Sequence, residues 1–263
     1  MPALMGIINV TPDSFSDGGQ YDSAPEAIAR GWRLIEEGAD ILDIGGESTR
    51  PGAAPVTPQQ EMDRVLQVIE GLHGCGKLIS IDTKNAATMR AALAAGAGMI
   101  NDVSALTADP DSLTFVAASD VPVCLMHMQG DPATMQKAPS YEDAVAEICA
   151  YLAARIIACT DAGIIKDRII VDPGIGFGKT LEHNLGLLNH IARFCDLGVP
   201  VLLGASRKSF IEGICPGTPP QDRLPGSLAA ALWAAQNGVS ILRVHDVAQT
   251  KQALAVHAAV TNV

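Results

Sequence analysis

Short apolar runs recur along the whole chain and alternate with segments that have a helical spacing of apolar residues. The apolar part of each run is four to six residues long and is mostly β-branched or leucine. The runs lack strict apolar–polar alternation, which is typical of strands buried on both faces of a parallel sheet. We expect strands within eight runs, at residues 4–10, 40–46, 77–82, 99–103, 121–128, 168–174, 199–206 and 240–246.

Between the runs, apolar residues recur at the three- and four-residue spacing of an amphipathic helix. In the first such segment Ala27, Trp32 and Ile35 fall at helical spacing, and Gly38 follows the last periodic residue. A glycine in this place favours a helix end, because it adopts left-handed backbone angles at no steric cost. We expect helices at residues 24–37, 60–72, 85–95, 141–162, 181–194, 228–237 and 247–260.

Strand followed by helix, repeated along the chain, predicts an α/β fold of the (β/α)8 barrel type. Such a barrel needs roughly 250 residues, and this chain has 263, so one domain spanning residues 1–263 would use it all. Hydrophobic residues make up 48% of the chain and aromatics only 4%, so the core must be built from Ala, Val, Ile and Leu. A doubly wound open sheet is the alternative.

The charge balance of the chain limits the classes of molecule that it can bind. Lys and Arg total 18 and Asp and Glu total 29, a net charge of −11, which argues against nucleic acid because phosphate binding needs a basic surface. The six cysteines form no C-x-x-C pair and indicate a reducing compartment. No targeting segment is visible, and no apolar run approaches the about 18 residues that span a bilayer. We therefore expect a cytoplasmic protein with no membrane partner.

Polar residues occupy the ends of the predicted strands. In a (β/α)8 barrel the active site lies just past the C-terminal end of each strand. All eight ends carry polar or charged groups, namely Asn9, 47–50, Asp82, 101–102, His127, Asp172, 206–208, and Arg243 with His245. This placement predicts a functional pocket, and hence an enzyme.

Three of these residues suit a flat heterocycle. Asp82, Asn101 and Asp172 each end an apolar run, and a buried carboxylate is costly unless it is paired or hydrogen-bonded. Two carboxylates and one carboxamide offer acceptors together with one donor–acceptor pair, which matches a ring edged with N–H and C=O groups. The alternative for each residue alone is strand-end capping, since Asp172-Pro173-Gly174 also favours a turn.

A cationic group follows the last two predicted strands, where barrels commonly bind phosphate. It consists of Ser206, Arg207, Lys208, Arg243 and His245. Arginine can hold a phosphate through two hydrogen bonds, and histidine can donate to it. A surface salt-bridge cluster is the alternative.

Other sequence motifs exclude some classes of active site and favour others. Residues 13–19 and 45–52 are glycine-rich and interspersed with Ser, Thr and Asp, which suggests mobile covers that also supply ligands. Residues 173–180 imitate a P-loop but have Pro173 where glycine is required. Neither G-x-S-x-G nor H-E-x-x-H occurs, so hydrolytic triads and zinc sites are disfavoured. A hard cation such as Mg²⁺, held by Asn9 and by phosphate oxygens of a substrate, fits the pocket.

With these residues in place, the sequence resembles the dihydropteroate synthase family over nearly its whole length. The resemblance rests on separate blocks in the same order along the chain. They are GIINVTPDSFSDGG (6–19), DIGGESTRPGA (43–53), SIDT (80–83), INDV (100–103), LMHMQG (125–130), DPGIGFGK (172–179), SRKSF (206–210) and RVHDV (243–247).

The resemblance implies a transferase of folate biosynthesis that joins a pterin methyl pyrophosphate to p-aminobenzoate, releases pyrophosphate and works as a homodimer. It implies that the pterin is bound by Asp82, Asn101, Asp172 and Lys208. It also implies that Asn9 ligates Mg²⁺ on the pyrophosphate, whose oxygens contact Arg243 and His245. By the same resemblance, the aminobenzoate is bordered by Thr49, Phe177 and Ser206.

The resemblance further implies that Asp17 and Arg50 lie on the two mobile loops that complete the site and act in catalysis with Asp82. As the pterin methylene loses pyrophosphate, the Asp82 carboxylate could stabilise the positive charge that develops on carbon.

Two alternative functions remain. A pterin-dependent methyltransferase would share the barrel and the pterin carboxylates but would have no use for a pyrophosphate clamp. A pterin-binding protein without turnover would be expected to lack Asn9, Lys208 or Arg243.

Overall fold

The computed structural model describes residues 1–11, 23–48, 56–132 and 134–261. Eight parallel strands form one sheet in the order β6-β5-β4-β3-β2-β1-β8-β7. Their bounds are β1 Ala3–Asn9, β2 Ile41–Gly45, β3 Leu78–Asp82, β4 Met99–Asp102, β5 Val123–Met126, β6 Ile169–Asp172, β7 Leu202–Leu203 and β8 Ile241–Val244.

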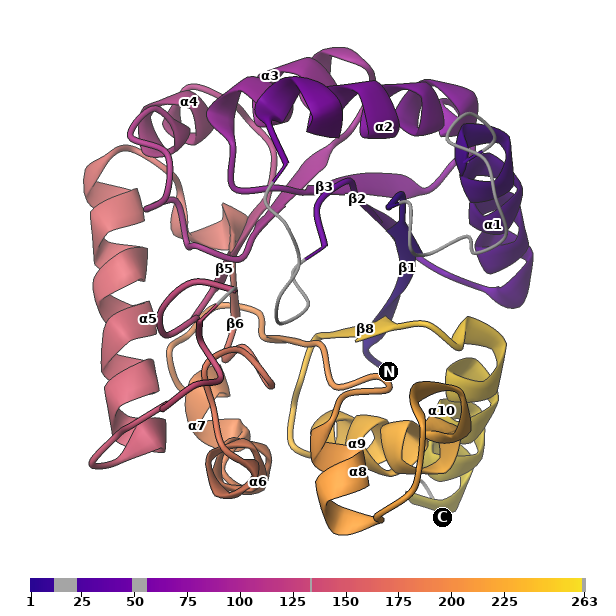
Figure 1. The fold of residues 1–263 in the computed structure, drawn as a ribbon, viewed down its shortest axis with the longest axis vertical. Helices are drawn as coiled ribbons and strands as arrows, with labels where there is room; N and C mark the ends of the chain where they lie inside the picture. The colour runs from indigo at the N-terminus through magenta and orange to yellow at the C-terminus, as the bar shows by residue number, and fades with distance from the viewer. Residues whose placement is uncertain (12–22, 49–55, 133, 262–263) are drawn as a thin grey trace.

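The two outer strands of this order meet and close the sheet. Val171 of β6 forms a parallel bridge with Val201, just before β7, and its N–H donates to the carbonyl of Pro200 at 3.0 Å. The helices surround the strands as an outer ring (Figure 1). The predicted (β/α)8 barrel is therefore confirmed, and the open doubly wound sheet is wrong.

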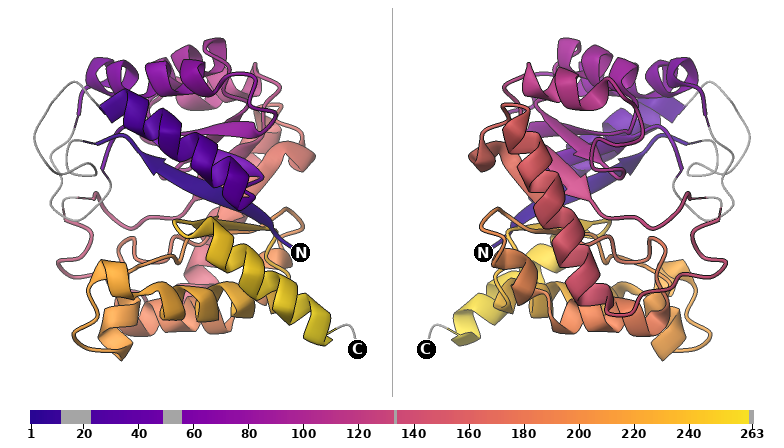
Figure 2. Two further views of the ribbon diagram at one scale, coloured as in Figure 1. Left: turned by 90° about the vertical axis from the view of Figure 1, so that its right-hand side faces the viewer. Right: turned by 90° about the vertical axis from the view of Figure 1, so that its left-hand side faces the viewer.

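The helices follow the strands around the barrel. Their bounds are α1 Ser23–Glu37, α2 Pro58–Leu72, α3 Ala86–Ala94, α4 Ser112–Ala117, α5 Ala144–Asp161, α6 Leu181–Asn189, α7 Ala192–Cys195, α8 Phe210–Ile214, α9 Leu224–Gln236 and α10 Val247–Thr261. Helices α1 and α10, from opposite ends of the chain, lie on the same side of the barrel against β1 (Figure 2).

Three helical features differ from the sequence-based expectation. Helices α4 and α8 were not predicted, because six and five residues are too few to establish a helical period. The single helix expected at 181–194 is two helices, since α6 ends at Asn189 and the next residue, His190, has a φ of −107°. None of these differences moves a strand end.

The interior of the barrel is layered because side chains alternate between the two faces of a strand. One apolar layer points inward near the start of the strands, and it contains Met5, Ile41, Met99, Cys124, Ile170, Leu202 and Ile241. Two residues further along four of these strands the same face carries Asp43, Asn101, Asp172 and Arg243. Strand periodicity thus places a polar layer directly above the apolar one.

A second, larger core lies between the strands and the helices. Leu42, Ile81 and Ile100 point outward from their strands and pack in one cluster with Leu34 of α1 and Val65 of α2, all five with exposed fractions of 0%. This outer core fixes the strand ends, and thereby the polar layer, against the ring of helices. Within the described ranges, no helix is both long enough and apolar enough to span a bilayer.

Candidate active site

Arg243 lies at the centre of the polar layer. Its Nε donates to Oδ2 of Asp43 at 2.6 Å, and its Nη2 donates to Oδ2 of Asp82 at 2.8 Å. The amide of Asn101 donates to the same Oδ2 of Asp43 at 3.1 Å. Four strands therefore contribute to one network of two carboxylates, a guanidinium and a carboxamide.

This network changes the proton affinity of Asp82. Burial, which disfavours the charged form, raises the pKa of Asp82 from 3.8 to about 7, and the carboxylates of Asp43 and Glu61 add to the rise, while Arg243 opposes it. Burial lowers the pKa of Arg243, but the carboxylates of Asp43 and Asp82 outweigh this and raise it above its ordinary value. Asp82 therefore titrates near neutrality beside a permanent cation.

Asp172 and Lys208 form the opposite side of the pocket. Oδ1 of Asp172 accepts from the N–H of Gly174 at 2.7 Å, so the turn expected from the sequence exists. Burial raises the pKa of Asp172, while the charge of Lys208 and this hydrogen bond lower it. Burial lowers the pKa of Lys208 to about 8, although Asp172 opposes the shift. The charges of the two side chains thus influence each other's protonation.

Phe177 and Lys208 are in direct contact. Nζ of Lys208 lies 4.4 Å from the ring centroid of Phe177 and donates to the carbonyl of Ile175. A cation over an aromatic face is attracted by the ring quadrupole. The DPGIGFGK loop is thereby connected to the loop that follows β7.

Ser206 and His245 lie together after β7 and β8. Nδ1 of His245 is 3.0 Å from Oγ of Ser206, and the His245 N–H donates to the same oxygen at 3.2 Å. Arg207, between Ser206 and Lys208, has a left-handed φ of 57° and pairs with Asp246 at 2.9 Å and 2.5 Å. For Arg207 the salt-bridge alternative is therefore correct, whereas Ser206 contacts His245 and Lys208 contacts Phe177.

Three buried charged residues near the site escaped the sequence-based prediction. Asp43 lies inside an apolar run rather than at its end, yet a charge within such a run is the same signal that identified Asp82. Glu61 on α2 accepts from the hydroxyls of Thr83 and Thr88 at 2.9 and 2.6 Å, and so holds the loop after β3. The third buried charged residue is Lys179.

Lys179 joins the loops that follow β5 and β6. Its Nζ donates to the carbonyl of Phe177 at 2.8 Å and lies 3.1 Å from Nδ1 of His127. Burial lowers the pKa of Lys179 to about 7, and burial together with the nearby Lys179 charge lowers the pKa of His127 to about 3. The histidine is therefore neutral near pH 7, and its lone pair can accept from the lysine.

Gly174 shows how closely the same two loops pack. Its φ is +71°, and a Cβ at this position would lie 1.9 Å from the carbonyl oxygen of His127. Only glycine fits both the left-handed conformation and the close approach. The DPGIGFGK loop is thus fixed against the end of β5.

The remaining predicted site residues fall into two groups. Asn9 ends β1, opposite Gly45 in the register with β2, at the C-terminal mouth of the barrel. Asp17, Thr49 and Arg50 lie outside the described residues. Among the residues that the structure describes, no group of three His, Cys, Asp or Glu side chains could hold a metal ion by itself.

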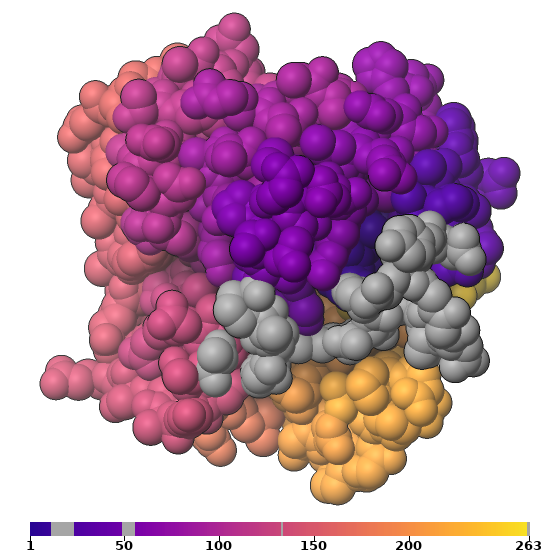
Figure 3. All heavy atoms as spheres, turned by 45° about the horizontal axis from the view of Figure 1, so that its top comes forward, coloured from indigo at the N-terminus to yellow at the C-terminus, as the bar shows by residue number. Residues whose placement is uncertain are grey.

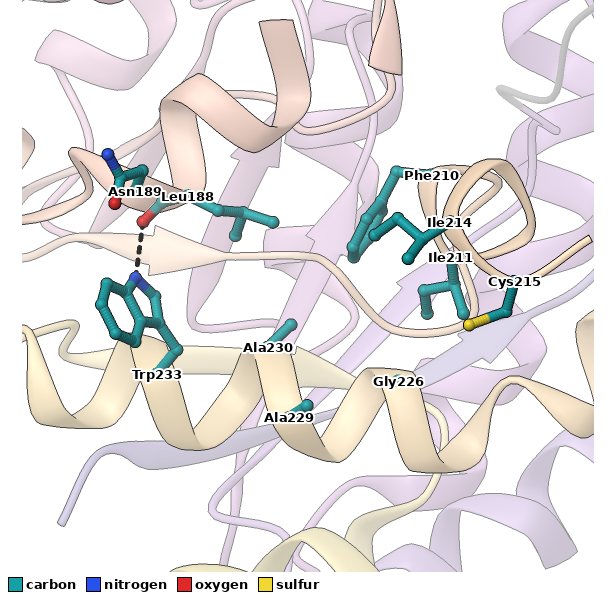
Figure 4. Close-up of a pocket in the computed structure, with 10 residues that line it drawn as sticks. All are labelled: Leu188, Asn189, Phe210, Ile211, Ile214, Cys215, Gly226, Ala229, Ala230 and Trp233. Atoms are coloured by element: carbon teal, nitrogen blue, oxygen red, sulfur yellow. Dashed lines mark hydrogen bonds between the residues drawn. The ribbon is translucent and has the colours of Figure 1, made fainter. Parts of the chain in front are cut away.

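An apolar cavity of about 400 Å³ lies elsewhere, between α6, α8 and α9 (Figure 4). Its lining includes Leu188, Phe210, Ile214 and Trp233, and the indole N–H of Trp233 donates to the carbonyl of Leu188 at 2.7 Å. In the space-filling view the orange atoms of the C-terminal quarter lie at the lower right of the face (Figure 3). This cavity contains no residue of the polar layer, and we do not assign the chemistry to it.

The fold and the site together define a pterin-binding barrel enzyme: residues 5–245 match the family described as pterin binding enzymes. Dihydropteroate synthase of Escherichia coli K12 is 47% identical over 256 residues, which cover 97% of this chain and 90% of that protein. The chain belongs to the dihydropteroate synthase family, the transferases of folate biosynthesis.

Solved structures agree with this membership. The dihydropteroate synthase of Xanthomonas albilineans in complex with 7,8-dihydropteroate has a TM-score of 0.91 and 51% identity, covering 100% of this chain and 94% of that one. The Yersinia pestis enzyme with a sulfonamide drug complex has a TM-score of 0.94 and 44% identity, with coverages of 100% and 95%. The family resemblance stated from the sequence blocks is therefore confirmed.

Proposed function

We propose that this chain condenses 6-hydroxymethyl-7,8-dihydropterin pyrophosphate with p-aminobenzoate to 7,8-dihydropteroate and releases pyrophosphate. One observation carries the proposal: Arg243 binds Asp82 and Asp43, Asn101 binds the same Asp43 oxygen, and these side chains lie with buried Asp172 above the apolar floor of the barrel. Such a layer solvates a polar heterocycle that is buried away from water.

In this proposal Asp172, Asn101, Asp82 and Lys208 bind the pterin. The Asp172 carboxylate accepts from ring N–H groups, and the Asn101 carboxamide can both donate and accept. Lys208, whose pKa is lowered to about 8 by burial, remains mostly protonated at pH 7 and donates to a ring acceptor. The network thus distinguishes a pterin by its pattern of donors and acceptors.

The pyrophosphate would lie beside Arg243 and His245. Nε and Nη2 of Arg243 already donate to carboxylates, whereas its Nη1 donates to none of the described residues and is suited to a phosphate oxygen. An Arg243→Ala variant should lose more affinity for the pyrophosphate-bearing pterin than for the plain pterin. Equal losses in calorimetry would mean that the anion site is elsewhere.

The donor chemistry at the end of β1 fits Mg²⁺. Asn9 offers a hard amide oxygen, and Mg²⁺ commonly combines few protein ligands with water and substrate phosphates. Since no three-ligand cluster exists among the described residues, we expect Asn9 and the pyrophosphate oxygens to hold the ion. When bound, Mg²⁺ would neutralise charge on the leaving group.

The protein side chains would act through charge. When the C–O bond to pyrophosphate breaks, its electron pair leaves with the phosphate oxygen, and the positive charge left on the methylene carbon lies near the ionised Asp82. Arg243 and His245 would stabilise the leaving anion. The nitrogen lone pair of p-aminobenzoate then forms the C–N bond, and the amine proton passes to water. Fixed charges aimed at developing charge commonly supply the largest contribution to catalysis.

The second substrate would lie near Phe177 and Ser206, next to the cationic Lys208. The contact between Lys208 and the Phe177 ring brings an apolar wall and a positive charge to the same place. A benzoate needs both, since its ring is apolar and its carboxylate is anionic. We propose that Thr49 borders this pocket and that Asp17 and Arg50 complete it from the two glycine-rich loops.

We further propose a cytoplasmic homodimer that pairs through the outer face formed by α6, α8 and α9. This face carries the exposed side chains of Leu185, Ile214 and Trp233 around the apolar cavity. Exposed apolar patches of this kind favour protein–protein contacts. Ile214→Glu should convert the dimer to monomers in sedimentation velocity, while Ile157→Glu, at an exposed isoleucine of α5, should not.

The function is tested by incubating the purified protein with pterin pyrophosphate, p-aminobenzoate and Mg²⁺ and by identifying the product by mass. We expect 7,8-dihydropteroate. If no product forms, methylation in a second incubation that contains a methyl donor would point to the methyltransferase, and pterin binding without any product in either incubation would point to the binding protein.

A further inference from the structure

Asp43 is the most completely buried member of the polar layer, with an exposed fraction of 0%. It lies in the middle of β2, and its Oδ2 accepts from Nε of Arg243 at 2.6 Å and from Nδ2 of Asn101 at 3.1 Å. One oxygen of a side chain from β2 therefore joins a residue of β4 to a residue of β8.

The geometry around Arg243 is fixed at two points. Nε is bound to Asp43 and Nη2 to Asp82, and a planar guanidinium held at two of its nitrogens has a defined plane and direction. Gly204 faces the stem of this side chain, since a Cβ there would lie 3.9 Å from Cβ and Cδ of Arg243. The direction of Nη1, which the proposed function assigns to pyrophosphate, follows from these contacts.

Keeping Asp43 in this place is costly. Its Oδ1 is buried and has no hydrogen-bond partner within the described ranges, and an unpaired buried polar atom disfavours folding. A residue needed only to fill space would be apolar, as Ile41 is two positions earlier on the same face. The energetic cost is consistent with a role in orienting the two residues that Asp43 contacts.

We propose that Asp43 is a positioning residue, which orients Arg243 and Asn101 for the pyrophosphate and the pterin without touching either substrate. This inference rests on the proposed function of Arg243 and Asn101. Acting through Arg243, Asp43 should affect the leaving-group end of the reaction most strongly. Loss of its charge should therefore lower kcat more than it raises KM for p-aminobenzoate.

The test is a double-mutant cycle of Asp43→Asn and Arg243→Ala, with kcat/KM for pterin pyrophosphate as the measured quantity. Removing a charge-assisted buried hydrogen bond corresponds to a loss of about 10- to 100-fold in Asp43→Asn. In the Arg243→Ala background, Asp43→Asn should lower kcat/KM by less than about threefold, because Arg243, the main residue that Asp43 orients, is absent. Equal losses in both backgrounds would overturn the proposal.

Controls separate positioning from damage to the fold. Asp40→Asn removes an exposed carboxylate just before β2, whose one side-chain contact with the described residues is the Leu4 N–H at 2.9 Å, and should leave activity unchanged. If Asp43→Asn does not fold, the cycle is repeated with Asp43→Ser, whose smaller hydroxyl can still accept one hydrogen bond. If the unmodified protein forms no dihydropteroate, the proposed function fails, and the cycle is run on calorimetric affinities for pterin pyrophosphate, where additive losses again contradict the role of Asp43.

Discussion

Nη2 of Arg243 lies 2.8 Å from Oδ2 of Asp82, although 161 positions of sequence separate the two residues. The contact joins the last strand of the barrel to the third. It also brings a permanent cation to the carboxyl whose pKa burial raises to about 7. The protonation of the proposed catalytic carboxylate therefore depends on a residue from the far end of the chain.

Replacing Arg243 should raise the pKa of Asp82. In Arg243→Gln the cation that lowers the pKa of Asp82 is lost, while burial, Asp43, Glu61 and Asp102 still raise it, so the pKa should rise above about 7. Because ionised Asp82 is the active form in our account, the acid limb of kcat/KM should move to higher pH. Carbon NMR of the Asp82 carboxyl measures the shift directly.

The matched control is Arg207→Gln, which removes a cation paired with Asp246 and should leave the acid limb in place. An acid limb that does not move in Arg243→Gln would mean that Asp82 is not the group that limits activity at low pH.

The raised pKa of Asp82 also has a consequence for stability. Between about pH 4 and 7 the folded protein holds a proton on Asp82 that the unfolded chain releases, so stability falls as pH rises through this window. Asp82→Asn removes this titration. Its melting temperature relative to the unmodified protein should therefore increase from pH 4 to pH 8, while turnover is lost. A constant difference in melting temperature across this range would show that Asp82 does not titrate abnormally.

Asp172→Asn should nearly abolish pterin binding and leave the fold intact. Its carboxylate is buried, and loss of a charge-assisted hydrogen bond costs about 1.5–3 kcal/mol, or about 10- to 100-fold in affinity. Calorimetry with a plain pterin measures the effect. Asp167→Asn, at an exposed carboxylate before β6, is the control, and pterin affinity equal in both variants would remove Asp172 from the site.

Sulfonamides should inhibit the enzyme competitively with p-aminobenzoate. A sulfonamide is an aromatic amine with a polar or anionic para group, so it imitates the second substrate in shape and charge. Discrimination needs a feature that clashes with the larger para group, and the blocks DIGGESTRPGA, DPGIGFGK and SRKSF contain none that we can identify. Steady-state inhibition at varied p-aminobenzoate decides the matter. Full activity at a large excess of drug would show that the pocket excludes it.

Much of the fold and part of the site could be predicted from the sequence. The eight strands were predicted because apolar runs mark buried strands, and Asp82, Asn101 and Asp172 were proposed as site residues because each ends such a run. Asp43 was missed because it lies two residues after Ile41 inside a strand, where only the closed barrel shows that its side chain points inward.

The partners of Arg243 could not be predicted. The sequence placed it after the last strand as a phosphate ligand, but its contacts with Asp43 and Asp82 arise from the closure of the barrel, which brings β8 beside β1 and across from β2 and β3. The splitting of the helix at 181–194 and the short α4 are likewise local outcomes that a period of about four residues does not resolve.

The central claim is that p-aminobenzoate replaces pyrophosphate on the pterin methylene carbon, and the rate of pyrophosphate release tests it most directly. We predict that release from pterin pyrophosphate, followed with and without p-aminobenzoate, is sustained only when the amine is present and matches the dihydropteroate formed one for one. Sustained release at the same rate without p-aminobenzoate would show a hydrolase, and no release in either condition would show a binding protein, so either result would contradict the account.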